Sequence, residues 1–180
     1  MRNPRAKRQT VALRVALVGI MAATVECGKL ALASIPNVEV VTLLLGLYSY
    51  VFGWLGILAA VIFVCIEPLI WGFGTWVISY FIYWPTLALV FMMLGRIRVK
   101  NRLILSGVAV LLTVLFGVLT SLVDVGLFSG AFDNFFARFS IYYMRGVPFY
   151  VTQILCNAVL FVSVFPFLAG RLSRALTKMR

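Results

Sequence analysis

The stretch Ser34-Ile35-Pro36-Asn37-Val38-Glu39-Val40-Val41-Thr42 is a polar, proline-containing interruption between two apolar blocks. The first block covers residues 11–33 and the second begins at Val40. Proline disfavours a helical conformation in the residue before it, so we expect the first helix to end at about Ile35. We predict that Asn37 caps the next helix and that Glu39 lies near its positive N-terminal end. The stretch is either a capped turn or the polar edge of a pocket at the membrane surface.

The composition indicates a membrane protein. Only 12% of the 180 residues are charged and 63% are hydrophobic, whereas soluble domains contain about 25% charged residues. The net charge of +11 is concentrated beside apolar blocks, which is typical of membrane topology and argues against nucleic-acid binding. The chain has three cysteines, far apart in apolar blocks, and no histidine. We therefore expect neither a metal site nor a disulfide framework.

The apolar blocks predict six membrane-spanning helices, because a span needs about 20 residues. The blocks are residues 11–33, 40–52, 55–70, 77–94, 103–128 and 146–168. Gly53-Trp54 is predicted to form a tight turn between the second and third helices. Pro85 is expected to kink the fourth helix. Residues 129–143 are expected to form a loop, and Pro148 to lie in the opening turn of the sixth helix.

The basic residues predict the orientation of these helices. The N-terminus (residues 1–10), the loop 96–102 and the tail (residues 170–180) each contain four basic residues, so together they hold twelve of the sixteen. Six spans place all three segments on one side, and the positive-inside rule assigns that side to the cytoplasm. The expected fold is a single all-α domain, residues 1–180, that forms a six-helix multi-pass bundle with both termini cytoplasmic.

Most of the acidic residues are predicted to lie toward the outer side. Glu26 and Lys29 are three residues apart on one helix, where they either form a local pair or serve a function. Glu67 is expected at the outer membrane edge, where it accepts backbone hydrogen bonds or binds a ligand. Asp133 falls in the predicted outer loop. Asp124 is expected to hydrogen-bond locally, since a proton relay would need partners that the sequence does not offer.

Aromatic and polar residues supply further candidates for an outer pocket. The aromatic residues form two clusters, which are Trp71, Phe73, Trp76, Tyr80, Tyr83 and Trp84 after the third block, and Tyr142, Tyr143, Phe149 and Tyr150 at the start of the sixth. They form either an interfacial belt or, with Gly72 and Gly74, a lid over a ligand. The aromatic members of the predicted pocket are Trp71, Phe73, Trp76, Tyr80 and Tyr143. Arg145, Gln153 and Asn157 are spaced by eight and four residues, so we expect them to share an inward polar face. No catalytic signature is present, and the chain is not expected to be an enzyme.

The first apolar block also carries a small-residue stripe. Ala12, Ala16, Gly19 and Ala23 follow one another at intervals of four, three and four residues. Such a stripe allows another helix to approach closely. The partner is either a helix of the same bundle or a separate membrane subunit.

The stripe and the proline-containing stretch at residues 34–42 together resemble a known family. The Ala-x-x-x-Ala of Ala12 and Ala16, the sequence Ile-Pro-Asn-Val-Glu-x-Val-Thr-Leu-Leu at residues 35–44 and the Trp-Gly-Phe-Gly-x-Trp at residues 71–76 are similar to the substrate-binding S component of energy-coupling factor (ECF) vitamin transporters. The sequence at residues 35–44 is the most specific of these features. Among subgroups, the pattern is most similar to the cobalamin-type S components of lactobacilli.

The resemblance implies a function and partners. It implies a bacterial cell-membrane protein that binds a vitamin in an outward cavity and topples to release it inward. It further implies a membrane coupling subunit, docked on Ala12 and Ala16, and two cytoplasmic subunits that hydrolyse ATP. No bound cofactor is expected other than the vitamin, which is cobalamin by the subgroup or else riboflavin, folate, pantothenate or a nucleobase precursor. The alternatives are a membrane scaffold or assembly factor without a ligand, and a small intramembrane enzyme.

Overall fold

The structure is a computed structural model that describes residues 4–128 and 134–178. Its elements in chain order are α1 (Pro4–Leu32), α2 (Val41–Phe52), α3 (Trp54–Trp71), α4 (Trp76–Arg96), α5 (Arg102–Val123), a π-helical segment η1 (Asp124–Phe128) and α6 (Phe135–Lys178). The described part of the chain contains no strand. The prediction of an all-α protein is therefore confirmed. Asp133 lies outside the described residues.

Five helices are long and apolar enough to cross a membrane. They are Val11–Leu32 of α1, α3, α4, α5 continued through η1, and α6. The sixth, α2, has 12 residues, which at about 1.5 Å per residue extend about 18 Å, short of the roughly 30 Å hydrocarbon core. The chain is thus a multi-pass membrane protein in which α2 is shorter than the membrane is thick.

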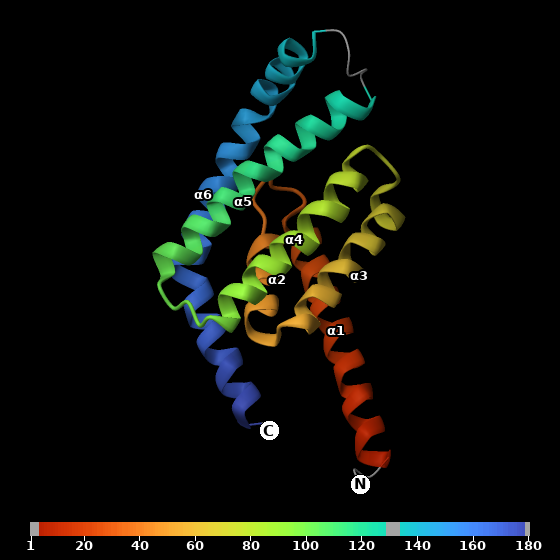
Figure 1. Cartoon of the computed structure of the whole chain (residues 1–180), viewed down its shortest axis with the longest axis vertical. Coiled ribbons are helices and arrows are strands. Elements are labelled where there is room, and N and C mark those ends of the chain that lie inside the picture. Colours follow the sequence, from red (N-terminus) through yellow and green to blue (C-terminus); the bar gives the residue numbers. More distant parts are fainter. Residues whose placement is uncertain (1–3, 129–133, 179–180) are drawn as a thin grey trace.

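The helices form one bundle in which the chain repeatedly reverses direction (Figure 1). Helices α1 to α4 pack together, while α5 and α6 pair along much of their length and join the rest through contacts of α6 with α2 and of α5 with α4. Both termini lie at the same end of the bundle, shown at the bottom of Figure 1. The loop between α3 and α4 lies toward the opposite end, as does the connection from α1 to α2, which we call the hinge (residues 33–40).

A single glycine makes the reversal between α2 and α3. Gly53 ends α2 and begins α3, with φ of 61° and ψ of −123°. This is a left-handed backbone conformation that glycine adopts at little cost and other residues rarely adopt. The predicted tight turn at Gly53-Trp54 is confirmed, and it sets α2 and α3 side by side.

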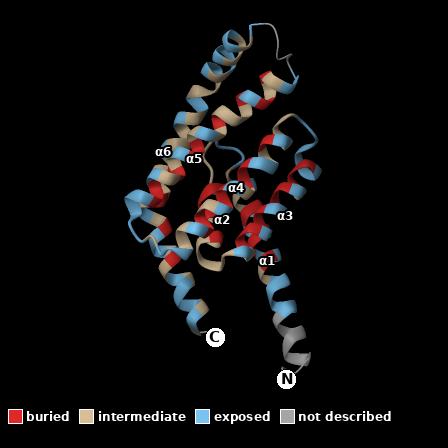
Figure 2. Ribbon diagram, in the orientation of Figure 1, coloured by how far each residue is buried: buried red, intermediate tan, exposed pale blue. Residues whose placement is uncertain are grey.

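The buried core surrounds α2. Its largest fully buried side chains include Phe63 of α3, Phe91 of α4, and Phe161 and Phe165 of α6. Figure 2 shows buried residues on α2 and the neighbouring parts of α3 and α4. The α1 turn at residues 11–16 and the end of α6 are mostly exposed. Many large apolar side chains on the outer faces are exposed, as expected where a helix faces lipid.

The start of α6 differs from the prediction. Residues 135–143 are helical, not part of a loop, and Pro148 lies inside the helix instead of in its opening turn. Phe135, Phe139 and Tyr143 are spaced by four residues, and their rings stack at centroid distances of 6.1 and 5.9 Å. Such contacts favour helix, and proline is tolerated inside membrane helices. The helix also continues through most of the predicted basic tail, to Lys178.

Candidate ligand-binding site

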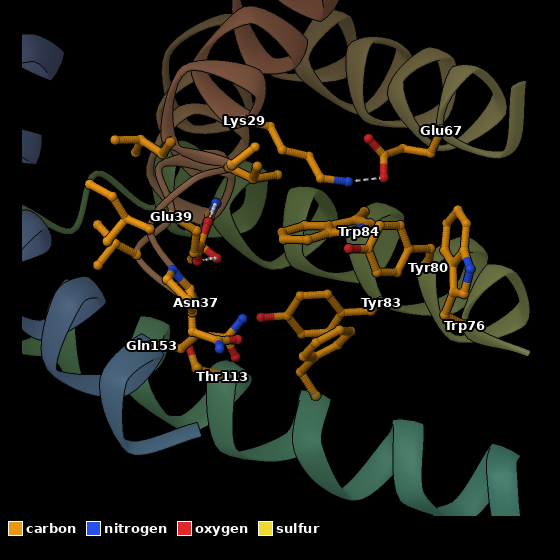
Figure 3. A pocket seen from close by; sticks show the side chains of 18 of the residues that line it. Lys29, Asn37, Glu39, Glu67, Trp76, Tyr80, Tyr83, Trp84, Thr113 and Gln153 are labelled. Carbon is orange, nitrogen blue, oxygen red and sulfur yellow. Dashed lines mark hydrogen bonds and ion pairs between the residues drawn. The ribbon is translucent and has the colours of Figure 1, made fainter. Parts of the chain in front are cut away.

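A cavity of about 360 Å³ lies between the hinge and the helices. Small-molecule sites typically measure about 300–1,000 Å³. Every α-helix contributes to its lining: Lys29 and Leu32 from α1, Val41 and Thr42 from α2, Glu67 and Trp71 from α3, Trp76, Tyr80, Tyr83 and Trp84 from α4, Thr113 and Phe116 from α5, and Gln153 from α6. The hinge adds Ala33, Ile35, Pro36, Asn37, Val38 and Glu39. Figure 3 shows several of these side chains directed toward a common space.

The hinge is a compact turn whose cap differs from the prediction. The amide of Ile35 donates to the carbonyl of Leu32 (2.9 Å), and Asn37 has a left-handed φ of 60°. Asn37 does not cap α2, because the N-cap position is occupied by Val40, which makes no side-chain cap bond. Glu39 supplies the cap instead by accepting from the amide of Thr42 (2.9 Å) and from its Oγ1 (2.5 Å). The predicted position of Glu39 near the start of the helix is confirmed.

The Glu39 carboxylate also ties the hinge to the α5–α6 pair. Its Oε1 accepts from Nδ2 of Asn157 at 2.8 Å, and the same Nδ2 lies 3.0 Å from Oγ1 of Thr113. Oγ1 of Thr113 donates to the carbonyl of Ala109 at 2.9 Å. Asn157 is fully buried and its Oδ1 has no partner. The Glu39 carboxylate thus joins the hinge to α2 and α6 directly and to α5 through Asn157.

A buried ion pair stands across the cavity from this network (Figure 3). The ammonium of Lys29 pairs with Oε2 of Glu67, a carboxylate with no exposed surface. The Lys29 Nζ atom lies 5.2 Å from the ring centroid of Trp71 and 5.4 Å from that of Tyr80. Of the two alternatives for Glu26 and Lys29, the local ion pair is not formed, because Lys29 pairs with the fully buried carboxylate of Glu67 on α3.

Glu26 interacts with the neighbouring Glu67 carboxyl and not with a donor side chain. It is 8% exposed, and within the described residues no amide, hydroxyl or ammonium group donates to either of its carboxyl oxygens. It lies close enough to Glu67 and Lys29 to interact with them electrostatically. The second oxygen of Glu67, Oε1, is likewise buried without such a donor. Unpartnered buried polar atoms are uncommon and often mark functional positions.

The remaining wall of the cavity is aromatic. Tyr80 contacts Trp76 and Trp84 edge-to-face at centroid distances of 4.9 and 5.6 Å. Tyr83 lies 4.6 Å from Phe116 of α5. These rings contact one another and line the cavity.

The structure brings together eight of the twelve predicted pocket residues. Those eight are Asn37, Glu39, Thr42, Glu67, Trp71, Trp76, Tyr80 and Gln153, and Asn157 lies beside the lining as a partner of Glu39. Phe73 is 83% exposed, Arg145 is exposed, and Tyr143 packs against Phe139 and Tyr150; none of these three lines the cavity. Arg145 therefore does not share the inward face of Gln153 and Asn157. The lining residues that the predicted set lacked include Lys29, Tyr83, Trp84, Thr113 and Phe116.

Two other predicted features have clear positions. Ala12, Ala16, Gly19 and Ala23 are all exposed, and a Cβ atom at Gly19 would meet nothing within 4 Å. The stripe is therefore not used for packing within the described chain. Asp124 accepts a hydrogen bond from the hydroxyl of Tyr142 at 2.7 Å, which links η1 to α6.

Comparison with protein-family models, curated proteins and solved structures finds no match to this chain. The functional argument therefore rests on the chain itself. Its main elements are a cavity lined by every helix, a hinge that forms one wall, and a small-residue stripe that no part of the described chain covers.

Proposed function

We propose that the chain is the substrate-binding membrane subunit of an ATP-driven importer of the energy-coupling factor type. The observation that carries this proposal is the cavity between the hinge and all six α-helices. In this proposal the hinge residues Asn37 and Glu39 gate the cavity from the outside. A site enclosed by a turn and by helices from both halves of the bundle is suited to a ligand that must be held before it is transported.

The proposed orientation follows from charge. The basic loop 96–102 and both termini are assigned to the cytoplasm of a bacterial cell. The cavity then faces outward, because the hinge lies toward the opposite end of the bundle from the termini. In this proposal the chain crosses the membrane six times, and the 12-residue α2 is the shortest crossing.

The proposed ligand is a compact vitamin or vitamin precursor. A cavity of about 360 Å³ lies near the small end of the range for small-molecule sites. By volume alone it suits riboflavin, pantothenate or a nucleobase precursor better than the much larger cobalamin. The aromatic wall favours a ligand with a flat ring.

The proposed partners supply the energy. The exposed stripe of Ala12, Ala16, Gly19 and Ala23 is suited to close contact with a helix of a membrane coupling subunit. Two cytoplasmic ATPase subunits would then drive release of the vitamin into the cell. The chain itself binds and carries the vitamin and is not assigned a catalytic step.

The test is vitamin binding followed by uptake. Purified full-length protein is heated with riboflavin, folate, pantothenate, cobalamin or nucleobases, and a ligand at 100 times its Kd should add about 2.7 kcal/mol to stability. Gln153→Leu alters the lining, and since Gln153 makes no side-chain hydrogen bond among the described residues, it should reduce that gain without unfolding the protein. Thr86→Val, at an exposed position on α4, is the matched control.

The uptake measurement separates this function from its alternative. Cells that express the chain with a coupling subunit and two ATPases should accumulate the stabilising vitamin. If no vitamin stabilises the protein and none is taken up by the full complex, the importer proposal is wrong. A scaffold or assembly factor would then be the better interpretation.

A further inference from the structure

One corner of the cavity already holds a positively charged group of the protein, the ammonium of Lys29. The Lys29 ammonium pairs with Glu67. The centroids of the Trp71, Tyr80 and Phe63 rings lie 5.2, 5.4 and 5.8 Å from it. Several aromatic faces beside a carboxylate form the arrangement that proteins use to bind organic cations. Lys29 therefore occupies a site whose chemistry suits a positively charged ligand group.

The same corner contains a second, unused place for the Lys29 ammonium. Glu26 lies three residues before Lys29 on α1, a spacing that puts the two side chains on the same face. Both Glu26 carboxyl oxygens and Oε1 of Glu67 are buried, and no amide, hydroxyl or ammonium group among the described residues donates to them, although the two carboxyl groups interact with each other. Leaving such groups unpaired costs free energy, so an ammonium that changed its side-chain rotamer would find a favourable acceptor on its own helix.

We infer that this corner is a cation site in which a ligand replaces Lys29 on Glu67 while Lys29 moves to Glu26. The ligand class is a compact ring that carries an amidinium, aminopyrimidinium or similar cationic group. The inference rests on the proposed ligand-binding function and names the substrate class of that site. Glu67 contacts the ligand, and Glu26 is a positioning residue that acts through Lys29.

The charge of the lining favours a cationic ligand over an anionic one. The charged residues that line the cavity are Glu39, Glu67 and Lys29, and Glu26 lies behind them. The Glu39 oxygens accept three hydrogen bonds from Thr42 and Asn157. A ligand carboxylate would have only Lys29 to bind and would be repelled by the neighbouring acids. A ligand cation gains Glu67 and the aromatic rings, and Lys29 keeps a carboxylate partner.

Three probes of one shape test this inference. Benzamidine is a cation, benzamide is neutral and benzoate is an anion, and all three carry one flat ring. Binding to the full-length protein is followed by tryptophan fluorescence, because Trp71, Trp76 and Trp84 line the cavity. Trp54, the other tryptophan of the chain, does not line the cavity, so Trp54→Phe removes it from the signal. We expect benzamidine to bind at least tenfold more tightly than benzamide or benzoate.

The variants separate ligand contact from Lys29 displacement. Glu67→Gln should weaken benzamidine at least tenfold. Lys29→Gln should strengthen it, since no cation must first leave Glu67. Glu26→Gln should weaken benzamidine several-fold in the parent protein but have no effect in the Lys29→Gln background, and this double-mutant cycle identifies the role of Glu26.

A variant without the ion pair serves as a further control. The double variant Lys29→Gln, Glu67→Gln removes both charges and should bind benzamidine and benzamide equally. Thermal unfolding of every variant shows whether a loss of binding reflects a loss of fold.

Two results would overturn the cation site. One is tighter binding of benzoate that disappears in Lys29→Gln, which would make the corner an anion site. The other is the absence of binding by all three probes. Both outcomes leave the importer proposal standing if a vitamin stabilises the protein and is taken up, so the two failures are distinguishable.

Discussion

The carboxylate of Glu39 in the hinge accepts a hydrogen bond of 2.8 Å from the amide of Asn157, 118 positions later in the chain. The same carboxylate accepts from the backbone of Thr42 at the start of α2. One side chain thus caps a helix and fastens the hinge to α6. The wall of the cavity is held in place by this hydrogen bond, which can break and form again.

Removing this contact should loosen the hinge. Asn157→Leu keeps the approximate size of the side chain but takes away the donor, leaving Glu39 with Thr42 alone. Interhelical polar bonds in membranes are worth about 0.6 to 2 kcal/mol, so we expect thermal unfolding to begin several degrees lower. Hydrogen exchange at residues 34–40 should also become faster. Ser163→Ala, which removes a hydroxyl bound only within α6, should change neither.

The close approach of α1 to the hinge gives a second prediction. A Cβ atom at Gly28 would lie 2.8 Å from Cγ2 of Val40, so Gly28→Ala must push Val40 and the hinge outward. We expect destabilisation of about 1–3 kcal/mol, as for other overpacked sites, and weaker binding of any ligand that stabilises the parent protein. Gly107→Ala is the matched control, because a Cβ there meets nothing within 4 Å and alanine favours helix. Equal effects of the two substitutions would contradict the proposed contact.

The proposed orientation predicts which loops are reached from outside the cell. In a background with Cys27, Cys65 and Cys156 replaced by serine, Ser34→Cys introduces a thiol in the exposed hinge, and Lys100→Cys does so in the basic loop. A membrane-impermeant maleimide should label the hinge cysteine in intact cells and the loop cysteine only after permeabilisation. The opposite pattern would place the cavity on the cytoplasmic side.

Much of this fold could be predicted from the sequence because breaks in hydrophobicity are local signals. Pro36 and Gly53 mark helix ends by restricting the backbone, and α2 to α5, with α5 continued through η1, begin and end within about two residues of the predicted blocks. The start of α6 was missed because residues 135–143 are rich in aromatic and polar side chains and resemble a loop. Their helical state is supported by ring contacts at spacings of four. Because Pro148 was expected in the opening turn, the predicted helix began too late, at residue 146.

The cavity could be predicted only in part. Polar residues such as Glu39, Glu67 and Gln153 stand out in an apolar chain, and they indicated the pocket. Tyr83 and Trp84 were recognised only as members of an aromatic cluster, and Phe116 was missed, because helices that are apolar on every face give no periodic signal to separate inward from lipid-facing positions. The pairing of Lys29 with Glu67 across 38 positions depends on the packing of α1 against α3. Local spacing instead favoured Glu26.

The exposed stripe on α1 gives the last prediction, which rests on the importer proposal. Ala16→Trp places a large side chain where a coupling subunit would approach, so it should abolish vitamin uptake and co-purification with that subunit. Binding of the vitamin by the isolated chain should persist, because Ala16 is exposed and distant in sequence from every residue that lines the cavity. The control is Leu13→Trp. Leu13 is also exposed, and it lies about 90° around the helix from the centre of the stripe, given about 3.6 residues per turn. Uptake should survive in that control, and loss of uptake in both variants or in neither would mean that the stripe does not form the docking surface.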